Sequence, residues 1–178
     1  MLDVIKKRSS VRKYKSTQIS EDIILDLIES ARLAPSGNNT QPWHFITVLD
    51  DSMRQKISEV SHNQKWMLTA PLFIVCIADL SARTGKTGIA IDENSPDENV
   101  KKIIRDTAIA VEHIVLNAVQ HGLGTCWVAW YSQNDMKNLL KLPFDKYVLC
   151  VLTVGYPDQE DKPRSRKALG EILHYEKW

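Results

Sequence analysis

The stretch "DENVKKIIRDTAIAVEHIVLNAVQHG", from Asp97 to Gly122, decides the fold of this chain. Its apolar residues recur every three to four positions, which is the spacing of one helix face. A long helix is therefore predicted from about Asp97 to His121, with Gly122 as its stop. The apolar face is broad enough to place this helix centrally in the core, and it consists of Val100, Ile103, Ile104, Ala108, Val111, Ile114, Val115, Ala118 and Val119.

Shorter elements flank this helix along the chain. An earlier helix is predicted after Ser20, a suitable N-cap, with Pro35 just past its end. Ser132 caps a later helix, with Asp135 at the capping-box position. Because helices and strands are mixed without regular β-α-β alternation, we expect an α+β fold rather than a doubly wound sheet. Four segments read as strands, the last apolar enough to lie inside a sheet: "HFITVLD", "PLFIVCIAD", "GTCWVAWY" and "YVLCVLTVGYP".

The composition is that of a soluble globular protein, and residues 1–178 are taken as a single domain. The chain has 178 residues, of which 43% are hydrophobic and 25% charged. A formal net charge of +1 argues against nucleic-acid binding, which usually needs a strongly basic face. The start, "MLDVIKKRSS", carries charges where a signal peptide needs an apolar run. The most apolar run, Leu68 to Ala78, contains Pro71 and is too short to span a bilayer, so no membrane partner is expected.

The cysteines and histidines indicate neither disulfides nor a metal site. Cys76, Cys126 and Cys150 form no C-x-x-C pair, and each lies in an apolar run, so we expect buried free thiols in a cytoplasmic protein. Nothing near Cys126 in the sequence would make it a nucleophile. The five histidines show no metal-ligand spacing, and His44 is expected to make a structural hydrogen bond. Residues Arg83 to Asn99 form a polar excursion, predicted to be a mobile lid or loop.

Basic residues concentrate at the two ends of the chain. Such charge runs are usually solvated faces. Here Ser9 and Ser10 add hydroxyl groups to the first cluster, and arginine can bind an oxyanion through two parallel hydrogen bonds. The two ends are therefore candidates for a phosphate site, and they consist of Lys6, Lys7, Arg8, Arg12, Lys13 and Lys15 at the start, and Lys162, Arg164, Arg166 and Lys167 at the end.

The loop "APSGNNTQPWHF", Ala34 to Phe45, is rich in neutral hydrogen-bonding groups. Asn38, Asn39 and Gln41 can each donate and accept, which suits a flat heterocycle with alternating carbonyls and ring nitrogens. A polar loop tied together by its own side chains is the alternative. No G-x-G-x-x-G follows a strand, so a dinucleotide site is not indicated. A phosphate clamp beside a surface for a flat ring describes a site for flavin mononucleotide (FMN).

Four motifs in order, "RSSVRKY", "APSGNNTQPWHF", "GLGTCWVAWY" and "RSRKALGEILHYEKW", resemble the signatures of the nitroreductase family of FMN-dependent oxidoreductases. The resemblance covers essentially the whole chain. It implies a mostly antiparallel central sheet flanked by helices, and a homodimer with FMN sites shared between the chains. It also implies NADH or NADPH as co-substrate and a nitroaromatic, quinone or similar small acceptor, reduced by a ping-pong mechanism that needs no catalytic side chain.

The resemblance also assigns FMN-binding roles residue by residue. In the N-terminal motif, Arg8 and Ser10 would serve the phosphate and ribityl end and Arg12 the pyrimidine side of the ring. Ser9 stands where relatives often have an Arg or a His. The loop that approaches from the second subunit contains Pro35, Ser36 and Asn39. The strand beside the ring contains Trp127, Val128 and Ala129, and the C-terminal phosphate site contains Arg164 and Arg166.

Three features of the sequence itself favour a dimer. The candidate site residues are scattered along the chain, and the long helix is apolar over more of its circumference than one sheet face needs. The tail "EILHYEKW" suits a C-terminal arm that crosses to a partner and pairs at a sheet edge. The acceptor stays open, because Ala129 and Trp130 replace a common Gly-Gly and could narrow the substrate pocket. Two alternatives also stay open: other flavin redox chemistry on this fold (enone reduction, dehydrogenation or flavin breakdown), and a non-catalytic flavin-binding module.

Overall fold

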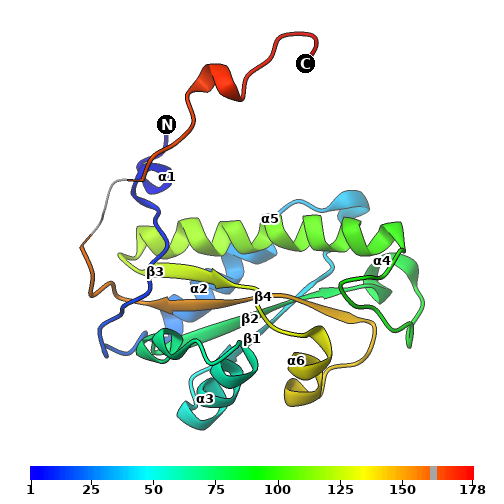
Figure 1. Ribbon diagram of the computed structural model, residues 1–178, viewed down its shortest axis with the longest axis horizontal. Coiled ribbons are helices and arrows are strands. Elements are labelled where there is room, and N and C mark those ends of the chain that lie inside the picture. Colours follow the sequence, from blue (N-terminus) through cyan, green and yellow to red (C-terminus); the bar gives the residue numbers. More distant parts are fainter. Residues whose placement is uncertain (161–163) are drawn as a thin grey trace.

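A computed structural model describes residues 1–160 and 164–178 of the chain (Figure 1). Its helices are α1 (Asp3–Lys7), α2 (Glu21–Arg32), α3 (Asp51–Val60), α4 (Ser81–Thr84), α5 (Glu98–Gln120) and α6 (Gln133–Leu140). Its strands are β1 (Trp43–Val48), β2 (Leu72–Asp79), β3 (Gly124–Val128) and β4 (Lys146–Gly155). Three short 3-10 turns complete the order: η1 (Gly37–Asn39), η2 (Lys65–Thr69) and η3 (Leu169–Glu171).

The four strands form one antiparallel sheet in the order β1-β2-β4-β3. The expected α+β class and the interior position of β4 are both confirmed. β4 lies inside because its residues from Val151 to Gly155 are all buried, as a strand covered on both faces requires. β1 and β3 are the edge strands, and β3 ends at Val128, earlier than the sequence predicts.

Helices cover both faces of the sheet (Figure 1). α5 and α2 lie on one face, where α5 buries Ile103, Ile114 and Ala118; α3, η2 and α6 lie on the other. The predicted limits of α5 are confirmed: the Asp97 side chain accepts a hydrogen bond from Asn99 N at 2.8 Å, and Gly122 follows the helix with φ of 71°. No helix among the described residues is long and apolar enough to cross a membrane.

The polar excursion that follows β2 is a loop, as predicted, but it is fastened to the body of the protein. It begins with α4, and its Ile91 is only 4% exposed. Ile91 N donates to Phe144 O at 3.1 Å, and the Lys137 ammonium donates to Ile91 O. Cys76, Cys126 and Cys150 are buried free thiols, which confirms that prediction.

Candidate functional site

The N-terminal segment runs beside the outer edge of β3. Ser10 forms a parallel bridge with Thr125, and Val11 N donates to Thr125 O at 2.9 Å. The segment can approach this closely because β3 begins with Gly124, whose missing Cβ leaves room for Val11. In the described part of the chain, no strand pairs with β3 on this side beyond Thr125, so the backbone of residues 126–128 faces an open edge.

Arginines from both ends of the chain meet at this edge. The Arg164 guanidinium donates to Ser10 O at 3.1 Å, which brings the C-terminal segment onto the N-terminal motif. Burial raises the pKa of the Cys126 thiol, and the positive charges of Arg12, Arg164 and Arg8 offset this rise only in part. The structure thus places Arg164 on the N-terminal motif that carries Arg8 and Arg12, beside β3. A cavity of about 460 Å³ opens beside them, lined by Ser9, Lys13, Asp158, Gln159, Glu160 and Arg164.

The three residues predicted from the third motif differ in exposure. Val128 is buried, Trp127 is 38% exposed and Ala129 is exposed. Trp130 is 65% exposed, so it is not a core residue, and its ring stacks on His62 with centroids 4.1 Å apart. Past Val128 the chain therefore leaves the sheet and turns an aromatic surface outward.

Sequence reasoning missed residues 61–66, which run from the end of α3 into η2. His62 stacks on Trp130, and the Arg12 guanidinium lies 5.7 Å from the ring centre of Trp66. The segment therefore links the N-terminal motif to the residues that follow β3. The sequence signal was limited to the adjacent residues His62 and Asn63, residue types that tolerate the positive φ that both adopt here. We add His62 and Trp66 to the candidate site.

The carboxamide-rich loop lies away from the arginines within one chain. Gly37 N bonds Asp106 on α5, whereas Ser9 shares a hollow with Val119 near the other end of the same helix. At about 1.5 Å per residue, the helix separates these points by about 20 Å. Within one chain, Gly37 and its neighbours Ser36 and Asn38 therefore lie well away from Ser9.

The local backbone explains part of the composition of this loop. Asn38, Asn39 and Gln41 have φ of 56°, 53° and 46°, a left-handed conformation that asparagine tolerates better than most residues. Ser36 Oγ accepts a hydrogen bond from Gln41 N at 2.9 Å. Backbone geometry and self-bonding thus account for some of these side chains, and the exposed amides of Asn38 and Asn39 are left facing outward.

The remaining C-terminal basic residues lie on an extended tail. Arg166 is exposed, and its guanidinium bonds only its neighbour Ser165 O among the contacts described. Lys162, part of the predicted basic cluster, lies outside the described residues. The tail leaves the body beside α1 and projects away from it (Figure 1). The structure thus brings Arg164, but not Arg166, onto the N-terminal motif.

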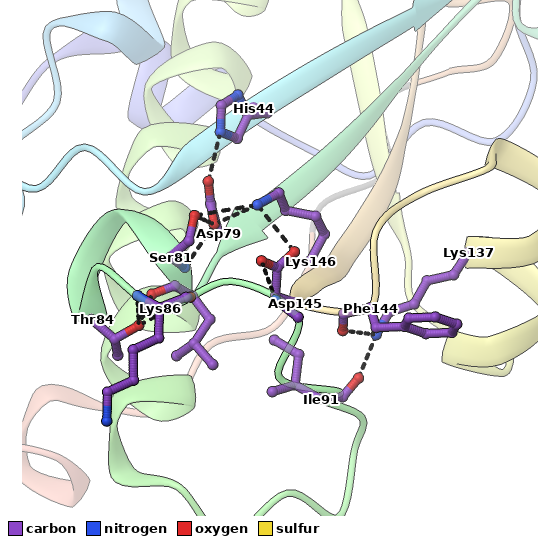
Figure 2. Close-up of polar contacts among 12 residues, drawn as sticks. His44, Asp79, Ser81, Thr84, Lys86, Ile91, Lys137, Phe144, Asp145 and Lys146 are labelled. Carbon is purple, nitrogen blue, oxygen red and sulfur yellow. Dashed lines mark hydrogen bonds and ion pairs between the residues drawn. The ribbon is translucent and has the colours of Figure 1, made fainter.

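A second polar cluster lies at the ends of β2 and β4 (Figure 2). Asp79 accepts hydrogen bonds from Lys146 Nζ at 2.7 Å and Ser81 N at 2.8 Å, and His44 Nε2 lies 3.2 Å from its other oxygen. The predicted structural hydrogen bond of His44 is therefore confirmed. These groups form hydrogen bonds with one another and with the start of the segment of residues 81–97, which runs from α4 to the start of α5. They therefore hold this loop in place rather than present a reactive group to solvent. Among the described residues, no His, Cys, Asp and Glu side chains are grouped to hold a metal ion.

Comparison with known proteins gives a consistent set of matches. The profile of the nitroreductase family matches residues 5–156. A Bacillus subtilis protein named as an NAD(P)H-dependent FMN reductase is 28% identical, over 99% of this chain and 74% of its own.

Solved structures match over most of the chain as well. A nitroreductase family protein from Clostridium novyi NT is 36% identical with a TM-score of 0.73, over 88% of this chain and 84% of its own. An FMN-dependent nitroreductase from Clostridium difficile R20291 is 27% identical with a TM-score of 0.82, and the match covers both chains fully.

Proposed function

This chain belongs to the nitroreductase family, and from that membership we propose that it is an FMN-dependent oxidoreductase. It uses NADH or NADPH to reduce nitroaromatic compounds, quinones or similar small acceptors. Relatives carry these activities in their names: one is an NAD(P)H-dependent FMN reductase and another an FMN-dependent nitroreductase. The whole chain, residues 1–178, acts as one FMN-binding domain.

The observation that carries the proposal is the meeting of arginines from both chain ends at the open edge of β3. Arg164 bonds Ser10 O, which joins it to the N-terminal motif that also carries Arg8 and Arg12. This set of donors fits FMN: cations and serine hydroxyls suit its phosphate, and unpaired strand backbone beside exposed aromatic rings suits its flat ring. Arg8, Ser9, Ser10, Arg164 and Arg166 are assigned to the phosphate and ribityl end, and Arg12, Trp127, Val128 and Ala129 to the ring.

When bound, FMN would supply the hydride-transfer chemistry between NAD(P)H and the acceptor. The protein orients the ring and adjusts its charge. Arg12 is the cation we assign to the carbonyl edge of the ring, where positive charge favours the reduced cofactor. A backbone N–H near Ala129 is the donor assigned to the ring nitrogen that accepts hydride.

No side chain of this site is needed as a nucleophile. Burial raises the pKa of Cys126, so its thiol stays protonated at neutral pH. His62 and Trp130, stacked at 4.1 Å, form a flat aromatic surface next to the proposed ring site. We assign this pair to the wall of the acceptor pocket, since the common Gly-Gly of relatives is absent here.

The working unit in this proposal is a homodimer, because one chain separates its site residues. The loop at 36–39 bonds Asp106 on α5, about 20 Å along that helix from the hollow that Ser9 and Val119 share, so a second copy supplies Pro35, Ser36 and Asn39 to each FMN site. On α5, Ile109 is 37% exposed, and Ile104, Ala108 and Val119 are only partly covered. This apolar surface supports burial against a second chain.

The C-terminal arm has a matching surface on the far edge of the sheet. β1 is unpaired on its outer side among the described residues, and a hollow of about 720 Å³ lies between β1 and α2. Its lining includes Leu25, Ile28 and Phe45. The arm exposes apolar side chains that would fill this hollow in the proposed dimer, namely Leu169, Ile172, Leu173, Tyr175 and Trp178. We propose that the arm of one chain pairs along β1 of the other.

The proposal includes a cytoplasmic location, which the three free cysteines support.

FMN binding by the purified full-length protein tests the function. We expect protein that is yellow or quenches FMN fluorescence on titration, and that oxidises NADH or NADPH when a nitroaromatic or quinone is added. Arg8→Ala should weaken FMN binding about ten- to a hundred-fold, because it removes charge-assisted hydrogen bonds. Lys56→Ala, which removes an exposed charge from α3, serves as the control and should bind like the wild type.

Two outcomes would contradict the proposal. Colourless protein that leaves FMN fluorescence unchanged would rule out the cofactor. FMN binding without any NAD(P)H oxidation, across a panel of acceptors, would favour a non-catalytic flavin-binding module instead.

A further inference from the structure

A buried carboxylate on α5 holds the loop at 36–39. Asp106 is 2% exposed, and its Oδ2 accepts a hydrogen bond from Gly37 N at 3.0 Å. Its other oxygen accepts from the guanidinium of Arg105 through two contacts of 3.1 Å. A carboxylate is buried at low cost only when cations and hydrogen-bond donors surround it. Asp106 has both, and through it the loop at 36–39 is attached to α5.

Arg83 supplies a second cation to the same carboxylate. Its guanidinium lies 3.7 Å from Asp106 Oδ2, and its side chain is 16% exposed. A Cβ added to Gly37 would lie 3.1 Å from that guanidinium, closer than nearly all such contacts. The backbone of the loop, Asp106 and the end of the Arg83 side chain therefore lie close together.

Arg83 is itself held, because it belongs to the fastened 81–97 segment (Figure 2). Lys137 Nζ donates to the backbone oxygens of Ile91 and Phe144, the latter at 3.2 Å. Gly88 N donates to Asp145 Oδ2 at 3.3 Å. The segment is thus anchored at its far end, and Arg83 at its near end lies within ion-pair distance of Asp106.

The loop needs such support because its backbone is unfavourable on its own. Asn38, Asn39 and Gln41 all have positive φ, and non-glycine residues persist in this region only where the surroundings impose it. We propose that Asp106 and Arg83 are positioning residues, which set the loop at 36–39 in the conformation that contacts the flavin of the partner subunit. This role rests on the proposed function.

Asp106→Asn tests the proposal in the FMN-loaded, full-length protein. The amide keeps the shape and an acceptor for Gly37 N but loses the charge that holds Arg83. We expect the FMN dissociation constant to rise about ten-fold, the visible absorption band of the bound flavin to shift, and hydrogen exchange in the peptide 35–41 to become faster. Gly37→Ala, which crowds Arg83 without removing a charge, should act in the same direction.

Lys101→Gln is the matched control. It removes an exposed cation from the same helix, and leaves Gly37, Arg83 and Arg105 on Asp106. Its FMN dissociation constant should stay within about two-fold of the wild type. Unchanged FMN affinity and an unchanged flavin spectrum in both Asp106→Asn and Gly37→Ala would overturn the positioning role. Wild-type protein that binds no FMN would overturn the proposed function instead, and hydrogen exchange would still report whether Asp106 holds the loop.

Discussion

At the scale of single residues, Asp79 shows how a buried charge fastens a loop. Burial alone would raise the pKa of this carboxyl, but hydrogen bonds from Lys146 and Ser81 outweigh that effect and lower the pKa from 3.8 to about 2. The folded state thus favours the ionised form. Its contribution to stability is fully present above the unfolded pKa and is lost as the pH falls through the folded pKa.

Asp79→Asn should therefore lower the free energy of unfolding by about 2 kcal/mol at pH 7. The difference from the wild type should shrink as the pH falls from about 4 toward 2, because the wild-type carboxylate is then protonated. Urea unfolding across this range measures it. Asp22→Asn, at an exposed position, is the control and should change stability by less than about 0.5 kcal/mol. A difference in the free energy of unfolding that stays constant down to pH 2 would contradict the stabilising role of the ionised Asp79.

At the scale of elements, the start of β3 controls where the N-terminal motif lies. A Cβ on Gly124 would lie 2.8 Å from Val11 Cβ and 3.1 Å from Pro157 Cγ, so any larger residue must push the N-terminal segment outward. Because Ser10 pairs with Thr125 beside it, that displacement would also move the proposed phosphate site.

Gly124→Ala should cost about 1–3 kcal/mol of stability through overpacking, and FMN binding should weaken with it. Denaturant unfolding and FMN titration measure the two effects. Gly170→Ala is the matched control for stability, since a Cβ there meets nothing within 4 Å of the same chain. Wild-type stability in Gly124→Ala would show that the N-terminal segment is not packed against β3 as described.

At the scale of the whole molecule, the described tail from Arg164 to Trp178 is exposed throughout, and Trp178 is fully exposed. So many exposed apolar side chains on one arm are unusual for an isolated chain and suit a surface on another copy. The arm and the groove beside β1 would then join two chains at positions remote from the arginine cluster.

Deleting Leu173 to Trp178 should weaken association and FMN retention together, while every proposed FMN contact stays in the chain. Light scattering gives the mass, and absorption at the flavin band gives the bound FMN. Full-length protein that is monomeric, holds FMN and turns over NADH would refute the shared site.

Much of the fold could be predicted from local signals in the sequence. Periodic apolar residues and Gly122 fixed the limits of α5, and the continuous apolar run of β4 placed that strand inside the sheet. These signals are reliable because helix faces, stops and buried strands depend on residues close together in the chain. The N-terminal arginine-serine motif could also be recognised, because its residues are close together in the chain.

Tertiary structure alone decided which distant residues meet. The sequence offered no signal that His62 would stack on Trp130 or that Asp106 would bond Gly37, because these contacts depend on how α3, α5 and β3 pack. It also could not show that the loop at 36–39 lies away from the arginines within one chain. By itself, the sequence determined most of the elements and indicated the donors of the proposed site. Packing determined which pieces one chain can bring together, since contacts between distant segments form only when the core closes.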